Sequence, residues 1–205
     1  MMNASRTLIS TCLLALMLAG GCASFQVGRD VQAGRSALQS GHPEEAVIYL
    51  GRAAESDPNY KLPTRAQESI LTYLGRAYYE TGDNTKARAV LERALANDSN
   101  DHLAHLYLGL TLYRSNDREQ GRKEIDAGLN GLHAWLDDVS SDSAYGSYWD
   151  PNRTIRLAIE RTLAGKPEAG EFIASAQRIG RQFDSEIDRA RQSESRSIYQ
   201  PGGRN

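Results

Sequence analysis

The chain has 205 residues, of which 24% are charged and 40% are hydrophobic, and its formal net charge is −2. These fractions are ordinary for a globular protein, and the length suits one domain. A charge so close to neutrality gives no reason to expect nucleic acid as a partner.

Residues 1–21 are predicted to form a removable signal segment. Arg6 precedes an uncharged apolar run, Leu8 to Leu18, and small residues follow that run. The run is too short to cross a bilayer, which requires about 20 apolar residues. A positive start, a short apolar stretch and small residues at its end are typical of an export signal.

The end of this segment, Leu18-Ala19-Gly20-Gly21-Cys22, resembles the lipobox of bacterial lipoproteins, with Ala19 where that family prefers leucine. The resemblance implies that a lipid such as palmitate is attached to Cys22 and that cleavage makes this residue the first of the mature chain. It also implies a bacterial cell-envelope location. Because Ala23 stands where an aspartate favours inner-membrane retention, the periplasmic side of a Gram-negative outer membrane is preferred.

The use of cysteine supports the lipid anchor. The other cysteine, Cys12, lies inside the apolar run and would be removed with it. A lone free thiol at Cys22 would be a liability in an oxidising compartment, and acylation removes that liability. The alternative is an ordinary secretory signal with Cys22 as an incidental thiol. Residues 22–26 are predicted to be a short lipidated linker.

A repeat of 34 residues follows the linker. Residues 68–101 align with residues 102–135, so that Leu74-Gly75 falls on Leu108-Gly109, and residues 27–60 form a further copy. Glycines in corresponding places, Gly34 among them, are predicted to let two antiparallel helices approach closely. No stretch shows sustained period-two alternation, so strands are not expected.

The repeat resembles the tetratricopeptide repeat (TPR), whose pattern begins W-x₂-L-G-x₂-Y and continues A-x₃-F. The second copy has Leu71-x₂-Leu74-Gly75-x₂-Tyr78, then Ala87-x₃-Leu91. The resemblance implies an all-α fold of about three helix pairs over residues 27–133, divided as 27–60, 68–101 and 102–133.

Helix ends are marked inside the repeats. Gly41 and Gly82 can adopt the left-handed conformation that ends a helix. Pro43 stands at the expected first position of a helix, and Asp83 and Asp117 at expected N-caps.

Residues 134–150 are predicted to be an aromatic and acidic loop. Its aromatic residues either form a recognition site for a protein or sugar, or fold back to plug the end of the repeat stack. The candidates are Trp135, Tyr145, Tyr148 and Trp149.

Residues 151–195 are predicted to form capping helices, and residues 196–205 a disordered tail. Asp150-Pro151 is expected to begin the first of these helices, and Pro167 a longer one that ends near Ser193. The apolar stripe of the longer helix is predicted to be domain core, because a solenoid needs a cap on its last repeat. The stripe consists of Phe172, Ala176, Ile179, Phe183, Ile187 and Ala190.

In TPR proteins the first helix of each repeat faces a concave groove, and the resemblance implies candidate protein-binding residues there. Because the positions from the third repeat are almost wholly apolar, the C-terminal helices are expected to cover that end. Arg35, Arg76 and Tyr79 would then remain nearer an open groove. The candidates are Arg35, Leu38, Thr72, Arg76, Tyr79, Leu106, Leu110 and Tyr113.

No catalytic chemistry is expected. The chain lacks the nucleophile elbow, the phosphate-binding loop and the His-Glu-x-x-His pair. His102 and His105 are three residues apart, but no further ligand set is evident, so neither a metal nor another cofactor is predicted.

The sequence therefore favours a membrane-anchored envelope lipoprotein that acts as an adaptor or assembly factor for envelope proteins. The alternative is a small-solute-binding component that associates with an uptake transporter. The alternative predicts an enclosed apolar pocket lined by such residues as Leu106, Leu110 and Tyr113.

Overall fold

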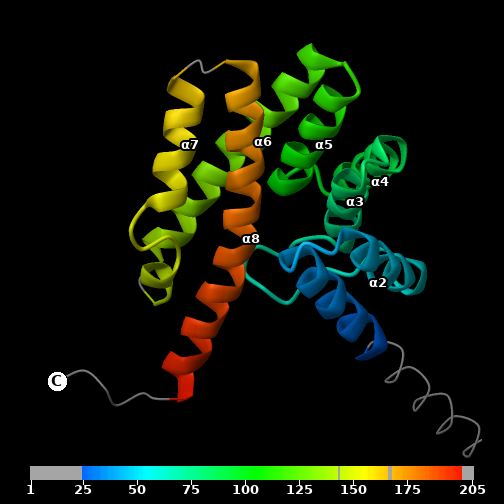
Figure 1. The fold of residues 1–205 in the computed structure, drawn as a ribbon. Coiled ribbons are helices and arrows are strands. Elements are labelled where there is room, and N and C mark those ends of the chain that lie inside the picture. Colours follow the sequence, from blue (N-terminus) through cyan, green and yellow to red (C-terminus); the bar gives the residue numbers. More distant parts are fainter. Residues whose placement is uncertain (1–24, 143, 166–167, 200–205) are drawn as a thin grey trace, which may run out of the picture.

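The computed structural model describes residues 25–142, 144–165 and 168–199 (Figure 1). This part of the chain is helical, apart from loops and one isolated antiparallel bridge between Lys61 and Ser69. The predicted signal segment, its cleavage site and Cys22 lie outside the described residues. Residues 25 and 26, which were assigned to the linker, already belong to the first helix.

Three antiparallel helix pairs form the first part of the fold. The helix over residues 25–39 pairs with α2 (Pro43–Ser56), and α3 (Ile70–Thr81) pairs with α4 (Asn84–Asn97). The third pair is α5 (His102–Arg114) and α6 (Arg118–Ser141). The predicted all-α, TPR-like repeat architecture is therefore confirmed.

Close approach within each pair depends on glycine. A Cβ atom on Gly34 would lie 2.5 Å from Leu50 Cγ, and one on Gly75 would lie 2.4 Å from Leu91 Cγ. In the third pair, a Cβ on Gly109 would lie 2.5 Å from the backbone nitrogen of Ile125. These distances are too short for a side chain, so glycine sets the spacing of the two helices.

The helix ends largely follow the predicted signals. Gly41 and Gly82 have φ angles of 77° and 84°, as expected for left-handed caps, and Asn116 takes the same conformation at φ 70°. The Asp83 carboxylate accepts a hydrogen bond from the backbone nitrogen of Lys86. Asp117 occupies the N-cap position of α6, as predicted, although its side chain makes no capping hydrogen bond.

The predicted loop over residues 134–150 is shorter than expected, because α6 continues through Ser141. Leu132, Leu136 and Val139 are buried and extend the apolar face of α6 at helical spacing. A short 3₁₀ turn, η1 (Gly146–Tyr148), follows α6.

The first capping helix, α7 (Thr154–Ala164), begins later than predicted. Asp150 still caps it, since its two carboxylate oxygens accept hydrogen bonds from the backbone nitrogens of Ile155 and Arg156 at 3.0 and 3.1 Å. The intervening residues form a turn in which Asp150 and Arg153 have φ angles of 42° and 54°.

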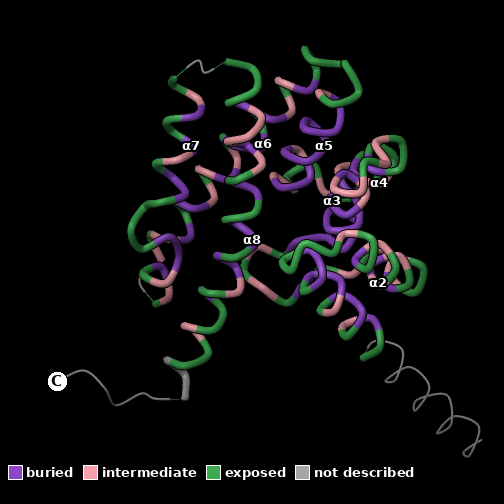
Figure 2. The backbone as a smooth tube through the Cα atoms, in the orientation of Figure 1, coloured by how far each residue is buried: buried purple, intermediate pink, exposed green. Residues whose placement is uncertain are grey.

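The last helix, α8 (Ala169–Tyr199), is longer than predicted, because residues 196–199 of the expected tail are helical. Residues 200–205 lie outside the described residues. Every residue of the predicted apolar stripe is buried, which confirms its assignment to the core. Figure 2 shows buried residues along most of α8 and exposed ones in its C-terminal turns.

Among the described helices, none is long and apolar enough to cross a membrane.

Candidate functional site

The C-terminal helix α8 lies across the first helices of all three repeats. Gln39, from the helix over residues 25–39, donates a hydrogen bond to Asp188 at 2.7 Å. From α3, Tyr79 accepts one from Gln177 through its hydroxyl. At α5, a Cβ on Gly180 would lie 3.0 Å from the Tyr107 hydroxyl, so glycine lets α8 sit close to that helix. The concave face of the repeats is thus occupied by the chain's own helix.

Asp184 is the centre of this contact, and its side chain is only 1% exposed. One carboxylate oxygen accepts hydrogen bonds from Arg35 Nη2 and from the Tyr73 hydroxyl, both at 2.8 Å. The other oxygen accepts a hydrogen bond from Arg76 Nη1 at 3.2 Å. Four groups from three helices therefore meet in a site without access to water.

Each arginine of this cluster has a second carboxylate partner besides Asp184, which is Asp188 for Arg35 and Glu80 for Arg76. Burial alone would raise the pKa of Asp184, but Arg35 and Arg76 outweigh burial and hold that pKa below its usual value. Burial likewise works against the charge of Arg35, yet Tyr73 and the Asp184 carboxylate raise its pKa above the ordinary value. Asp184, Arg35 and Arg76 therefore remain ionised at neutral pH. Their contacts fix α8 to the first two repeats.

The prediction of an open groove was wrong. Arg35, Arg76 and Tyr79, which were expected to line it, are 0%, 1% and 3% exposed. A buried arginine is costly unless a carboxylate pairs with it, and Asp184 supplies that partner from the far end of the chain. Leu38 and Thr72 are buried as well.

The third-repeat candidates are also covered. Leu106 and Leu110 have no exposed surface, and Tyr113 is half-buried. Leu106 Cδ2 lies 3.2 Å from a Cβ built on Gly180, so α8 fills the space beside it. The apolar pocket that the solute-binding alternative predicted at these leucines is therefore occupied by the protein itself.

Of the four aromatic candidates, Trp149 belongs to the core and Trp135 is partly buried and packs against it. Trp149 is 1% exposed, and its ring packs edge-on against Trp135, with centroids 4.9 Å apart. Trp135 packs in the same way on Phe183 of α8 at 5.5 Å. The indole nitrogen of Trp149 donates a hydrogen bond to Glu194 at 2.9 Å. This geometry assigns the two tryptophans to packing rather than to recognition.

The two loop tyrosines remain half-buried. Tyr145 lies under the guanidinium of Arg65, 4.8 Å from its ring centroid. The backbone carbonyl of Tyr148 accepts a hydrogen bond from Arg189 of α8. The loop is therefore tied both to the segment between the first two repeats and to the last helix.

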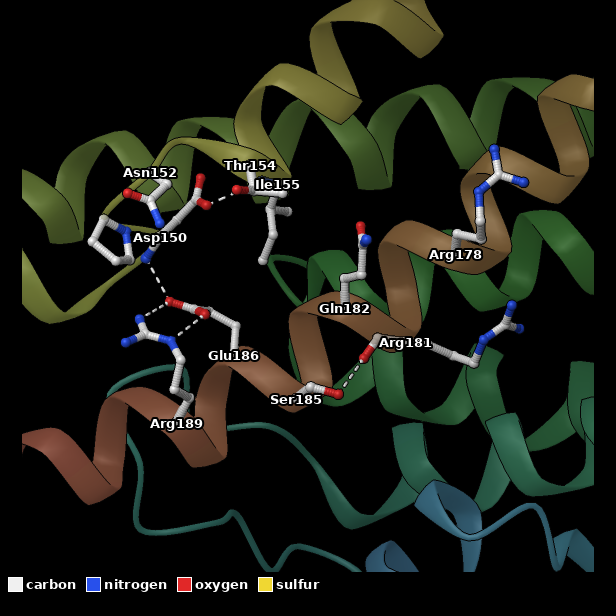
Figure 3. A pocket seen from close by; sticks show the side chains of 11 residues that line it. Asp150, Asn152, Thr154, Ile155, Arg178, Arg181, Gln182, Ser185, Glu186 and Arg189 are labelled. Atoms are coloured by element: carbon white, nitrogen blue, oxygen red, sulfur yellow. Dashed lines mark hydrogen bonds and ion pairs between the residues drawn. The ribbon is translucent and has the colours of Figure 1, made fainter.

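A pocket that was not predicted lies between the start of α7 and the middle of α8, with a volume of about 570 Å³ (Figure 3). Figure 3 shows Asp150, Asn152 and Thr154 on one wall, and Gln182, Ser185 and Glu186 on α8 opposite them. Arg178 and Arg181 lie at one end of the pocket and Arg189 at the other. The pocket could not be predicted from the sequence, because exposed arginines are common on helices and do not by themselves indicate a binding site.

Of the two histidines considered for a metal, His105 has other partners. His105 Nδ1 lies 2.7 Å from Glu124, and its Nε2 lies 3.1 Å from the carbonyl oxygen of Ser99. The imidazole of His102 is partly buried, which lowers its pKa. Within the described ranges, no group of three or more His, Cys, Asp or Glu residues is placed to hold a metal ion.

Comparison with known proteins identifies the repeats. A family model described as a TPR repeat matches residues 75–116, and one described as a tetratricopeptide repeat matches residues 31–60. Neither a search of curated proteins nor a search of solved structures found a significant match. The two matches fall on the first and second helix pairs and on α5. The chain therefore carries tetratricopeptide repeats on an all-α repeat fold, which suggests that it acts through protein–protein interaction.

Proposed function

We propose that this protein is a lipid-anchored TPR lipoprotein of the bacterial cell envelope, acting as an adaptor or assembly factor for envelope proteins. The observation that carries the proposal is the repeat scaffold itself, three helix pairs followed by two packed helices. Repeat scaffolds of this kind present extended surfaces and bind partners without a reactive group.

The occupied concave face determines where a partner can bind. Since α8 fills the face formed by the first helices, a partner would contact α8 and α7 from outside or the outer surfaces of the second helices. The interior pairing of Asp184 with two arginines favours a fixed α8 over one that leaves to admit a ligand.

The proposed anchor is close to the folded part. Cys22 precedes the first described residue, Phe25, by three positions, and Phe25 is 70% exposed. An exposed aromatic side chain beside an acyl anchor suits the membrane interface, where aromatic rings are favoured. The repeat domain would then lie close to its membrane.

The anchor is tested by mass spectrometry of the mature N-terminus, with Cys22→Ala as the comparison. The proposal expects an acylated Cys22 as the first residue, recovered with membranes, and loss of membrane association in the variant. An unmodified N-terminus at another position would refute the anchor.

The adaptor role is tested by crosslinking and pull-down with the intact chain in its own cells. The proposal expects reproducible recovery of specific envelope proteins. Repeated recovery of none, from cells in which the protein is abundant and folded, would count against an adaptor.

A further inference from the structure

We infer that the pocket between α7 and α8 binds an acidic segment of a partner protein, with Arg178 and Arg181 as its carboxylate-binding groups. The inference rests on the proposed adaptor function and adds the chemistry of the partner. It concerns a site outside the concave groove that TPR proteins are expected to use.

The hollow is large enough for several residues of a bound chain. Its volume of about 570 Å³ falls within the usual range of ligand sites, roughly 300–1,000 Å³. A second hollow of about 400 Å³ adjoins it along α7 and α8 and shares Arg178 and Gln182 as lining residues. Together they form a groove from Asp150 to Gly165, which is long enough for an extended peptide.

The acidic groups of the main pocket are already neutralised. Asp150 accepts hydrogen bonds from the start of α7 and from Arg156 Nε at 3.2 Å. Glu186 accepts from the backbone nitrogen of Asp150 and forms an ion pair with Arg189. Neither carboxylate is therefore left to attract a cation, and neither cancels the two arginines at the other end.

Arg178 and Arg181 keep their charge available. Arg178 donates a hydrogen bond to the neutral Ser175 hydroxyl at 2.7 Å, and both side chains are exposed. Neither forms an ion pair within the described residues. In the adjoining hollow, Arg161 adds a third cation and Glu171 the one acidic residue of its lining. The groove is thus locally basic in a chain whose net charge is −2.

This arrangement fits carboxylates on a peptide. A guanidinium presents a planar pair of donors that matches a carboxylate, and residues three apart on a helix lie on the same face. Ile155 and Pro151 add apolar surface, while Thr154, Gln182 and Ser185 can bond to a peptide backbone. An extended, mixed lining of this kind suits a chain with acidic side chains better than a compact ion.

The test measures binding of a fluorescein-labelled hexaglutamate peptide to the full chain by fluorescence anisotropy, with hexaglutamine as the neutral comparison. The inference expects saturable binding of hexaglutamate that weakens with salt, and none of hexaglutamine. Arg178→Gln/Arg181→Gln should weaken binding by about tenfold or more, because two charge-assisted contacts are lost.

The matched control is Arg93→Gln/Arg191→Gln, which removes the same charge from two exposed arginines outside the pocket. It should bind within about twofold of the wild type at equal ionic strength. Equal loss in both double variants, equal binding of both peptides, or binding of inorganic phosphate alone would overturn the inference. Circular dichroism of each variant establishes that the fold is retained.

The experiments distinguish failure of the acidic-segment inference from failure of the adaptor proposal. If the pull-down recovers partners that Arg178→Gln/Arg181→Gln also recovers, the adaptor role stands and the pocket is not its binding site. If no partner is recovered but hexaglutamate still depends on the two arginines, the pocket stands and the adaptor role fails.

Discussion

Arg35 and Asp184 lie 149 residues apart in the sequence, and their side chains meet in the core at 2.8 Å. Neither is more than 1% exposed. The pair joins the first repeat to the last helix and thus closes the fold from its two ends. Two charges removed from water are tolerated because Asp184 also accepts hydrogen bonds from Tyr73 and Arg76.

Asp184→Asn should destabilise the protein strongly. The substitution keeps the shape of the side chain but removes the buried carboxylate that Arg35 and Arg76 share. Only the more exposed carboxylates of Asp188 and Glu80 then remain as their partners. Loss of one member of a buried ion pair costs about 3–5 kcal/mol in the free energy of unfolding. Urea denaturation followed by circular dichroism measures the change.

Asp188→Asn is the matched control. Asp188 also pairs with Arg35, at 2.9 Å, but its side chain is 26% exposed and Asp184 remains in place. The expected loss is about 1 kcal/mol or less. Equal losses in the two variants would show that burial of Asp184 does not determine the stability of the α8 contact.

The helix pairs could be predicted because their signals are local. Small residues recurring every 34 positions, as at Gly75 and Gly109, follow directly from the need for two helices to touch. The stripe on α8 was recognised as core for the same reason, since its spacing is that of one helical face. What the stripe covers depends on contacts between residues far apart in the sequence, such as Phe183 with Trp135 and Phe172 with Arg122, which no local pattern contains.

Asp184 shows where local reasoning fails. It follows Phe183 directly, and Gly180 lies one helical turn before it, at the edge of the stripe. Two residues beside the stripe carried a signal in the sequence. Gly180 allows another helix to approach closely, and Asp184, one turn later, can pair with a buried cation. The groove arginines were expected to face solvent because burying them requires a partner that only the tertiary structure reveals.

Glu68→Gln should change how stability depends on pH. Burial raises the pKa of Glu68 to about 7 from a usual value of 4.5, and one of its carboxylate oxygens has no hydrogen-bond partner in the described structure. The folded protein therefore holds the proton more tightly than the unfolded chain. This contribution to stability is fully present below about pH 4.5 and is lost as the pH rises through 7.

Glutamine imitates the protonated carboxyl and can still accept the hydrogen bond from Thr64. The variant should match the wild type near pH 4.5 and exceed it by about 3 kcal/mol above pH 7, an order-of-magnitude figure. Urea midpoints from pH 4 to 8 measure the difference. Glu55→Gln, at an exposed position, should follow the wild type throughout, and a constant offset for Glu68→Gln would refute the titration.

Two glycines should respond to alanine with opposite signs. A Cβ on Gly109 would meet backbone atoms of α6, Ile125 N at 2.5 Å and Gly121 O at 2.6 Å, which cannot move aside cheaply. Gly109→Ala should therefore lower the free energy of unfolding by about 2 kcal/mol or more. Gly51, inside α2, has open space around its Cβ position, so Gly51→Ala should raise stability by ~0.5–1 kcal/mol. Thermal melts distinguish the two, and a stabilising Gly109→Ala would contradict the close contact of α5 with α6.

Alanine substitution of two aromatic residues beside η1 should have different effects, because Trp149 is buried and Tyr148 is only half-buried. Trp149→Ala removes a buried ring that packs on Trp135 and donates to Glu194, and a loss of about 3–5 kcal/mol is expected. Tyr148→Ala removes a half-buried side chain but leaves the backbone carbonyl that accepts from Arg189, so its effect should stay within about 1 kcal/mol. Chemical denaturation of both variants, together with pull-down from cells, distinguishes packing from recognition at each position. A Trp149→Ala protein that keeps its stability and loses its partners would reverse the assignment, because it would make the tryptophan a contact residue despite its burial.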